Sequence, residues 1–281
     1  MALFHRVTII GLGLIGGSLG IALKRRRLAK IVVGYSRKPA TLRAAKRRGA
    51  IDVGTTNLRT AVRSADLVIV ATPVDAIVPF ARRAARFCRP GAILTDVGST
   101  KSQVVRLLER SLPRTVLFVG GHPIAGSEQR GVGAARADLF SGSVCVLTPT
   151  ARTPRRALLD IRRLWTRVGM RVITMSPRDH DQLLAATSHL PHLVAACLST
   201  AQPDHLPTVA PSFLDMTRIA KSDPDLWDDI FLTNRRPLLD AIDRFDRQWR
   251  TIRSLLARAD RPRLLHVLRS ANRKRHALQD P

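Results

Sequence analysis

The stretch Val7-Thr8-Ile9-Ile10-Gly11-Leu12-Gly13-Leu14-Ile15-Gly16-Gly17-Ser18-Leu19 decides the fold. A short β-branched run leads into G-x-G-x-x-G, and an apolar helical pattern follows. Gly11 permits the tight turn out of the strand, Gly13 lets the backbone approach a pyrophosphate, and Gly16 lets helix and strand pack closely. Free N–H groups at the start of the helix would bind the phosphates. Because a strand precedes the glycines and a helix follows them, the stretch predicts a dinucleotide site that includes Leu14 and Ile15.

Beyond the glycines, apolar runs alternate with helical patterns and short connections. The run 66–71 is apolar almost throughout, as expected for a strand buried on both faces of a parallel sheet. The predicted strands are 31–35, 66–71, 92–97, 116–119, 142–148 and 170–175, with helices at 39–48, 77–87 and 154–168. We therefore expect an α/β fold with a Rossmann-type doubly wound parallel sheet in residues 1–177. Residues 178–281 hold no strand candidate and predict a second domain that is all helical.

The second predicted strand ends at Ser36-Arg37-Lys38, where a dinucleotide site selects its cofactor. An Asp or Glu here would accept a hydrogen bond from the ribose 2′-hydroxyl of NAD. Instead, no carboxylate repels a 2′-phosphate, and a guanidinium is available to bind one. The same residues would also suit a plain solvated turn. We expect NADP to be favoured over NAD, and we expect Thr72-Pro73-Val74 to cover the adenosine or nicotinamide side.

Polar residues follow two later strands, at the edge where such sheets bind their ligands. Ser99 comes after strand 92–97 and suits either a ligand contact or a helix cap, and position alone leaves both roles open. His122 stands between glycines and a proline directly after strand 116–119. Its sequence neighbours give it no apolar surround, so we expect a chemical role for an imidazole with the ordinary pKa of ~6.5.

The second half of the chain carries helical patterns. The segment 179–196 is helical throughout, with His189 and His192 three residues apart on one face. No carboxylate stands beside them at the spacing of a metal site, so we expect no metal. Pro191 removes a backbone N–H and is expected to kink the helix there. A helix over 237–252 has an apolar side that suits the core or a subunit interface (Leu238, Leu239, Ile242, Phe245, Trp249).

The composition is ordinary for a globular protein except for a formal net charge of +26. A basic surface attracts anions, nucleic acid among them. However, the arginines are spread along every helix and aromatic residues amount to only 4%, so we do not expect nucleic-acid binding. The three cysteines show no metal-ligand spacing. Without a secretory signal or an uninterrupted apolar segment of membrane length, we expect a soluble cytoplasmic protein.

Five motifs together resemble the prephenate/arogenate dehydrogenase family of tyrosine biosynthesis. They are Gly-Leu-Gly-Leu-Ile-Gly-Gly-Ser (11–18), Asp-Val-Gly-Ser-Thr-Lys (96–101), Gly-Gly-His-Pro-Ile-Ala-Gly-Ser-Glu (120–128), Ser-His-Leu-Pro-His (188–192) and Arg-Ile-Ala-Lys-Ser-Asp-Pro-Asp-Leu-Trp (218–227). The motifs fall in the family's order. The resemblance implies a dinucleotide domain, a helical dimerisation domain that forms a homodimer, and an active site between the two.

The reaction implied by the resemblance oxidises the hydroxyl-bearing carbon of a cyclohexadiene ring while the ring carboxylate leaves as carbon dioxide. His122 would take the hydroxyl proton as the carbonyl develops, and Ser99 would hydrogen-bond the same hydroxyl. Arg218 would bind a substrate carboxylate through a bidentate fork. His189 and His192 would line the substrate pocket, with Trp227 as a wall.

Three alternatives stay open at this point. No single residue decides between prephenate and arogenate, which present the same reacting carbon. A non-catalytic dinucleotide sensor or nucleic-acid-binding protein could use the same fold and its positive field. A related hydroxyacid dehydrogenase is a third possibility, although such enzymes usually depend on a lysine in the helical domain and do not show the 188–192 motif.

Overall fold

A computed structural model describes residues 2–126, 129–203 and 208–278. The main sheet is formed by β1 (Phe4–Ile10), β2 (Ala29–Tyr35), β3 (Val53–Thr55), β4 (Leu67–Val70), β5 (Ile93–Asp96) and β6 (Leu117–Val119). These six strands run parallel in the order β3-β2-β1-β4-β5-β6. The order reverses between β1 and β4, which is the switch point where dinucleotides bind in such sheets. The predicted α/β fold with a doubly wound parallel sheet is confirmed.

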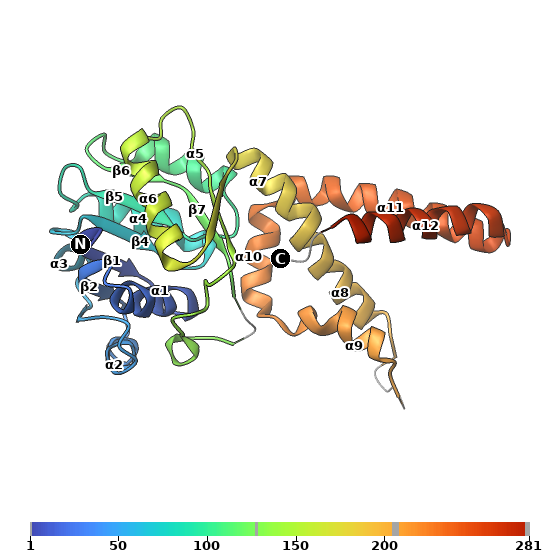
Figure 1. Ribbon diagram of the computed structural model, residues 1–281, viewed down its shortest axis with the longest axis horizontal. Coiled ribbons are helices and arrows are strands. Elements are labelled where there is room, and N and C mark those ends of the chain that lie inside the picture. The colour runs from blue at the N-terminus through green and yellow to red at the C-terminus, as the bar shows by residue number, and fades with distance from the viewer. Residues whose placement is uncertain (1, 127–128, 204–207, 279–281) are drawn as a thin grey trace.

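Helices cover both faces of this sheet (Figure 1). One apolar cluster joins the sheet to α1 (Leu14–Arg25), α2 (Pro39–Arg47) and α6 (Arg155–Val168). A second cluster joins the other face to α3 (Leu58–Val62), α4 (Val74–Ala85) and α5 (Ser102–Ser111). Burial of both faces explains why the central strand β4 consists of four fully buried apolar residues.

The predicted strands 142–148 and 170–175 exist, but they form a separate small sheet. It contains β7 (Gly121–Ile124), β8 (Val144–Leu147) and β9 (Arg171–Thr174), with β7 antiparallel to β8. The stretch around His122 is therefore an edge strand. Its sequence Gly-His-Pro-Ile does not predict a strand, because glycine and proline are unfavourable in strands. An edge strand nevertheless tolerates a proline, which has no N–H to donate.

The second half is entirely helical where the structure describes it. Its helices are α7 (Pro177–Leu184), α8 (Leu190–Thr200), α9 (Pro211–Thr217), α10 (Pro224–Thr233), α11 (Arg235–Ala257) and α12 (Arg261–Ala277). Figure 1 shows α11 and α12 reaching away from the sheet. The helix expected over 237–252 is the middle of the longer α11. The expected boundary at residue 177 stays a prediction.

The segment expected as one helix over 179–196 is interrupted. A π-helix (Ala185–His189) separates α7 from α8, and the Leu190 N–H donates to the carbonyl of Ala185, five residues back. Pro191 has no N–H for the carbonyl of Thr187, which favours the wider turn. The expected kink is thus a local change of helix type, and it alters the relative directions of His189 and His192.

Among the described residues, Pro177–Thr200 is the one helical run whose length and composition would let it cross a membrane. Length and composition alone are weak evidence. The run carries His180 and Asp181, which pack against the sheet half of the molecule.

Candidate active site

The glycine loop after β1 fits the pyrophosphate of a dinucleotide. Gly11 has φ +95°, and a side chain there would collide with the carbonyl oxygen of Ala71. A side chain at Gly16 would collide with the carbonyl of Gly11, whereas a Cβ at Gly13 would meet no described atom within 4 Å. The N-terminus of α1 has no side-chain cap and no acid in its first turn. Its N–H groups, those of Leu14 and Ile15 among them, are therefore available to an anion.

The end of β2 presents two exposed cations. Arg37 and Lys38 are exposed and form no ion pair among the described residues, and Ser36 Oγ accepts a hydrogen bond from the Lys38 N–H at 3.2 Å. No carboxylate occupies positions 36–38, where NAD-selective sites place one.

The turn after β4 differs in part from the expectation. Thr72 and Pro73 lie at the surface of the ligand edge, but Val74 opens α4 with its side chain buried in the second apolar cluster. The helix turns the Val74 side chain into the core, so only its backbone can face the ligand edge, and the expected cofactor contact of 72–74 stays a prediction. The carboxylate of Asp229 on α10 accepts a hydrogen bond from the Asp75 N–H at 3.1 Å, so the helical half reaches this edge.

The centre of the site is a hydrogen-bonded chain of two histidines and a carboxylate. His122 Nδ1 lies 2.8 Å from His180 Nε2, and His180 Nδ1 lies 2.9 Å from Asp181 Oδ1. His122 comes from β7, whereas the other two residues come from α7. All three side chains are buried. These hydrogen-bonded side chains therefore connect the two halves of the molecule.

The positions of the protons on the two histidines can be assigned by starting from Asp181. The pKa of Asp181 is lowered by hydrogen bonds from His180, Ser102 and the Lys101 backbone, which outweigh the opposing effect of burial. As an ionised acceptor, Asp181 requires the proton of His180 on Nδ1. His180 Nε2 then accepts from His122 Nδ1–H. The lone pair of His122 is left on Nε2, which has no hydrogen-bond partner among the described residues.

Burial decides the charge of both imidazoles. Desolvation lowers the pKa of His122 well below its ordinary value, and the nearby charges of His180, Lys101 and His189 act in the same direction. Desolvation also lowers the pKa of His180, against the hydrogen bond to Asp181 that raises it. The expected pKa of ~6.5 for His122 is therefore wrong. The residue is neutral at pH 7, as a proton acceptor must be, and it is a weaker base than an exposed histidine.

A buried ion pair holds the two loops around His122. Lys101 Nζ contacts Asp96 Oδ2 and donates to the Gly121 carbonyl at 2.9 Å. Asp96 accepts in turn from the Gly98 N–H at 2.9 Å. Both side chains of the pair are fully buried. This pair fixes the end of β5 and the start of β7 relative to each other.

Ser99 lies in the loop between β5 and α5, and the structure removes one of its two expected roles. The N-terminus of α5 is capped from outside, because Asp181 accepts from the N–H groups of Lys101 and Ser102 at 2.8 Å each. No serine side chain caps this helix. Ser99 is half-buried and has no hydrogen bond among the described residues, which leaves its hydroxyl available to a ligand.

His189, His192 and Trp227 are brought together in the helical half. The His192 ring stacks on Trp227 with centroids 3.4 Å apart, and His189 meets the same indole edge-on at 6.1 Å. Burial lowers the pKa of His189 to about 4. Arg218 is exposed, and its charge contributes to lowering the pKa of His192, mainly a result of burial. His189, His192 and Trp227, expected at the substrate pocket, therefore form one aromatic group, and the charge of Arg218 acts on the His192 ring.

Asn234, at the start of α11, sets the tautomer of His189. Its Nδ2 donates to the Asp181 carbonyl at 2.8 Å and lies 3.0 Å from His189 Nδ1. Only the NH₂ group can face a carbonyl, so His189 Nδ1 accepts and its proton lies on Nε2. In contrast, His192 Nδ1 lies 3.0 Å from the Ser188 carbonyl and must donate to it. At the remaining ring nitrogen, Nε2, His189 is therefore a donor and His192 is an acceptor.

Sequence reasoning missed His180, Asp181, Lys101 and Asn234. The pair His180-Asp181 stood inside a helical pattern, and nothing local connects it with His122, 58 residues away. The only available signal was the polar sequence Asp-His-Asp opening an otherwise apolar helix. The end of the 120–128 motif, Ser127 and Glu128, lies outside the described residues.

Comparisons with protein families and with individual proteins agree with one another. The family described as "Prephenate dehydrogenase, nucleotide-binding domain" matches residues 19–174, and "Prephenate dehydrogenase, dimerization domain" matches residues 176–270. The cyclohexadienyl dehydrogenase of Zymomonas mobilis is 36% identical, with 99% of this chain and 98% of that protein covered. The prephenate dehydrogenase of Bacillus subtilis is 35% identical, with coverage of 97% and 76%.

A solved structure also resembles this chain throughout. Prephenate dehydrogenase from Aquifex aeolicus, in complex with hydroxyphenyl propionate and NAD+, superposes with a TM-score of 0.92 at 35% identity. The superposition covers 98% of each chain.

Proposed function

Since this chain belongs to the prephenate dehydrogenase family, we propose that it catalyses the oxidative decarboxylation of prephenate, arogenate or both with a nicotinamide dinucleotide. The products would be 4-hydroxyphenylpyruvate or tyrosine, carbon dioxide and the reduced cofactor. The observation that carries this proposal is the hydrogen-bonded row of side chains Asp181–His180–His122. It leaves one unprotonated imidazole nitrogen beside the ligand edge of a dinucleotide-binding sheet.

His122 is the base in this mechanism. Its Nε2 takes the proton from the ring hydroxyl as the hydroxyl carbon becomes a carbonyl. His180 accepts from His122 Nδ1–H and thereby orients the ring, and Asp181 supports the positive charge that develops on the two imidazoles. When the ring carboxylate leaves and the ring becomes aromatic, the proton on His122 can return to the phenolate oxygen.

The cofactor would be held by Gly11, Gly13, Gly16 and the backbone N–H groups at the start of α1. When bound, the nicotinamide accepts the hydride from the hydroxyl-bearing carbon. Ser36, Arg37 and Lys38 would contact the adenosine ribose, with Thr72 and Pro73 at the neighbouring turn. The exposed cations at 37 and 38 support a preference for NADP, although the related Aquifex protein was crystallised with NAD+.

Substrate carboxylates require cationic or donor partners in a site shielded from water. Arg218 offers a guanidinium fork, and the His189 Nε2–H offers a neutral donor beside the Trp227 indole. Ser99 would donate to the reacting hydroxyl and fix its direction toward His122. The helical half thus supplies the binding groups and the sheet half supplies the base.

A homodimer would form through the helical half. Large apolar side chains of α11 are exposed on the single chain, Trp249 at 60% and Leu239 at 48% among them. Of the most apolar window within Pro177–Thr200, only 22% is buried in one chain. Apolar surface of this extent is typical of a subunit interface.

Initial rates of nicotinamide reduction test the proposed reaction. Prephenate and arogenate are each supplied with NAD+ and with NADP+, which gives four values of kcat/KM. We expect at least one pair to react, with the NADP+ value higher for the preferred substrate. An Arg37→Asp variant should reverse the cofactor preference. If no pair reacts, while the protein binds dinucleotide, the proposed reaction is excluded.

A further inference from the structure

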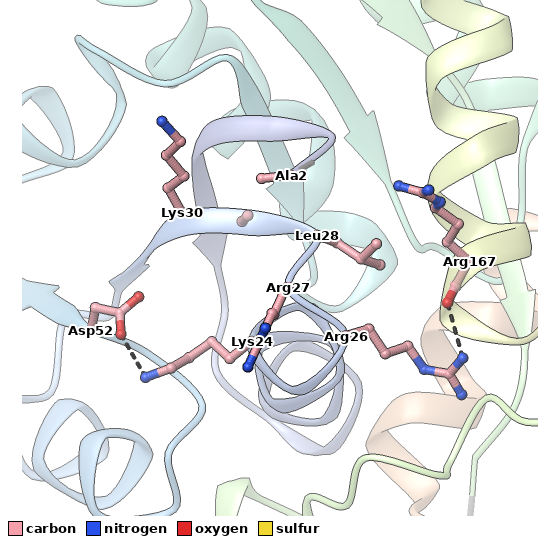
Figure 2. A pocket seen from close by; sticks show the side chains of 9 residues that line it. Ala2, Lys24, Arg26, Arg27, Leu28, Lys30, Asp52 and Arg167 are labelled. Atoms are coloured by element: carbon pink, nitrogen blue, oxygen red, sulfur yellow. Dashed lines mark hydrogen bonds and ion pairs between the residues drawn. The ribbon is translucent and has the colours of Figure 1, made fainter.

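An open cavity of about 890 Å³ lies beside the C-terminus of α1. It is lined by Lys24, Arg26, Arg27, Lys30, Arg167 and Asp52, together with Ala2, Leu28 and Ala29 (Figure 2). Because Lys30 is the second residue of the parallel strand β2, the cavity lies at the amino-terminal edge of the sheet, opposite the glycine loop. A neighbouring cavity of about 450 Å³ shares Arg167 and adds Arg162 and Arg163.

Most of the positive charge in this cavity is unpaired. Lys24 Nζ lies 2.6 Å from Asp52 Oδ1 and neutralises the one carboxylate of the lining. Arg26 donates to the carbonyl of Arg167 at 3.0 Å, a contact drawn in Figure 2 that links α1 to α6. Arg27, Lys30 and the guanidinium of Arg167 form no ion pair within the described part of the chain.

Arg27 occupies a backbone position that favours glycine. Its φ is +53°, and it follows α1 as the left-handed residue of a Schellman motif. In this motif the Arg27 N–H donates to the Lys24 carbonyl at 3.1 Å, and the Leu28 N–H donates to the Leu23 carbonyl at 2.8 Å. A non-glycine residue is strained here, and such strain is concentrated at functional sites. A long cation is thus held at the rim at a cost in stability.

We propose that this cavity is a second ligand site, which binds a small anion carrying several linked phosphate groups. Guanidinium forks match phosphate oxygens, and the lysine adds a compact charge. No aromatic residue is among the described lining residues, so the only planar groups that the cavity offers are the guanidinium groups, which also bind phosphate. We therefore assign recognition to the phosphate chain. This site is separate from the proposed catalytic one and does not depend on it.

Titration calorimetry with inorganic tripolyphosphate tests the proposal. The protein is first saturated with its dinucleotide, so that the glycine loop is blocked. Arg27→Gly and Lys30→Ala each remove one cation of the cavity, and Arg269→Ala removes one from the exposed face of α12. Ala259→Gly is the second control, because Ala259 also occupies a left-handed position, with φ +50°, but far along the chain after α11.

We expect one site per chain, with affinity lowered roughly tenfold by Arg27→Gly and by Lys30→Ala. Arg269→Ala and Ala259→Gly should leave the affinity within twofold. Both glycine variants should raise Tm by roughly 2–4 °C, so the loss of binding in Arg27→Gly cannot be attributed to misfolding.

Three results would overturn the proposal. The first is no measurable binding to the wild-type protein. The second is an equal loss of affinity in Arg269→Ala, which would assign the binding to net charge. The third is a short DNA duplex that binds more tightly than tripolyphosphate and loses affinity equally in all the arginine and lysine variants.

Discussion

Among the individual residues, His180 is the hydrogen-bond partner of the proposed base His122. It contacts neither substrate nor cofactor in the proposed mechanism. It accepts from His122 Nδ1–H and is itself oriented by Asp181. Replacing it with leucine leaves the buried His122 N–H without a partner. We expect His180→Leu to lower kcat by ~10²-fold with KM little changed, and His180→Gln, which keeps an acceptor, to recover part of the loss.

The pH–rate profile separates this positioning role from a merely structural one. Because burial lowers the pKa of His122, the acid limb of kcat/KM should lie below pH 6.5 in the wild-type protein. The limb should shift in His180→Gln, since the neighbouring imidazole contributes to that lowered pKa. An unchanged limb with an unchanged kcat would exclude His180 from the mechanism.

The buried histidines also make stability depend on pH. His122, His180 and His189 have lowered pKa values, so below pH 6.5 the unfolded chain binds more protons than the folded one. The free energy of unfolding should therefore be highest above pH 6.5 and fall as the pH drops from 6.5 toward about 4, the value for His189. Urea denaturation at several pH values measures this. His189→Phe should reduce the slope, and an unchanged slope would contradict the contribution of His189.

At the residue scale, the features that depend only on neighbouring residues in the sequence could be predicted. The close packing around Gly11 and Gly16 follows from the loop motif, and His122 was proposed as a functional residue from its glycine and proline neighbours. The partners of His122 could not be predicted, because the contact with His180 exists only after β7 and α7 have packed together. The lowered pKa of His122 has the same origin, since burial is a property of the fold.

Secondary-structure elements whose hydrophobic pattern is strong were predicted well. The strands β1, β2 and β4 and the helices α1 and α6 follow directly from apolar runs and periodicity. The strands β3 and β7 were missed, because one has three residues and the other contains glycine and proline. The π-helix was anticipated only as a kink, since Pro191 shows where a hydrogen bond is lost but not how the helix adapts.

The π-helix gives a prediction that belongs to the element itself. In Pro191→Ala, a restored N–H can bond to the Thr187 carbonyl, which favours a regular α-helix and rotates His189 relative to His192. We expect KM for the cyclohexadiene substrate to rise severalfold, with the dissociation constant of the dinucleotide unchanged. Pro177→Ala, at the first turn of α7, is the matched control and should leave both constants unaltered. An unchanged KM in Pro191→Ala would argue against a role of the π-helix in positioning the two histidines.

In the molecule as a whole, the proposed site lies where the two halves meet. Thr233 Oγ1 lies 3.1 Å from Thr100 Oγ1, Asp229 binds the N–H of Asp75, and Asn234 binds the carbonyl of Asp181. The first contact joins α10 to the loop before α5, and the second joins α10 to the first turn of α4. The third joins α11 to α7, which itself caps α5. The proposed base and the proposed substrate-binding residues come from opposite sides of this junction.

The exposed apolar side of α11 predicts the oligomeric state. Trp249 is 60% exposed, and its ring faces that of Phe245 at 6.3 Å. Trp249→Glu places a charge in the proposed interface, so sedimentation should show a monomer where the wild-type protein is a dimer. Leu159→Glu, on the exposed face of α6, is the control and should remain dimeric. A wild-type monomer at micromolar concentration would contradict this prediction.

The central claim is that an unprotonated nitrogen of His122 removes the hydroxyl proton during nicotinamide reduction. Its most direct test is kcat of His122→Asn at saturating substrate and dinucleotide, compared with the wild-type enzyme. We predict a decrease of ~10²–10⁴-fold, with the dissociation constant of the dinucleotide within twofold of the wild-type value. A kcat within threefold of wild type would contradict the account.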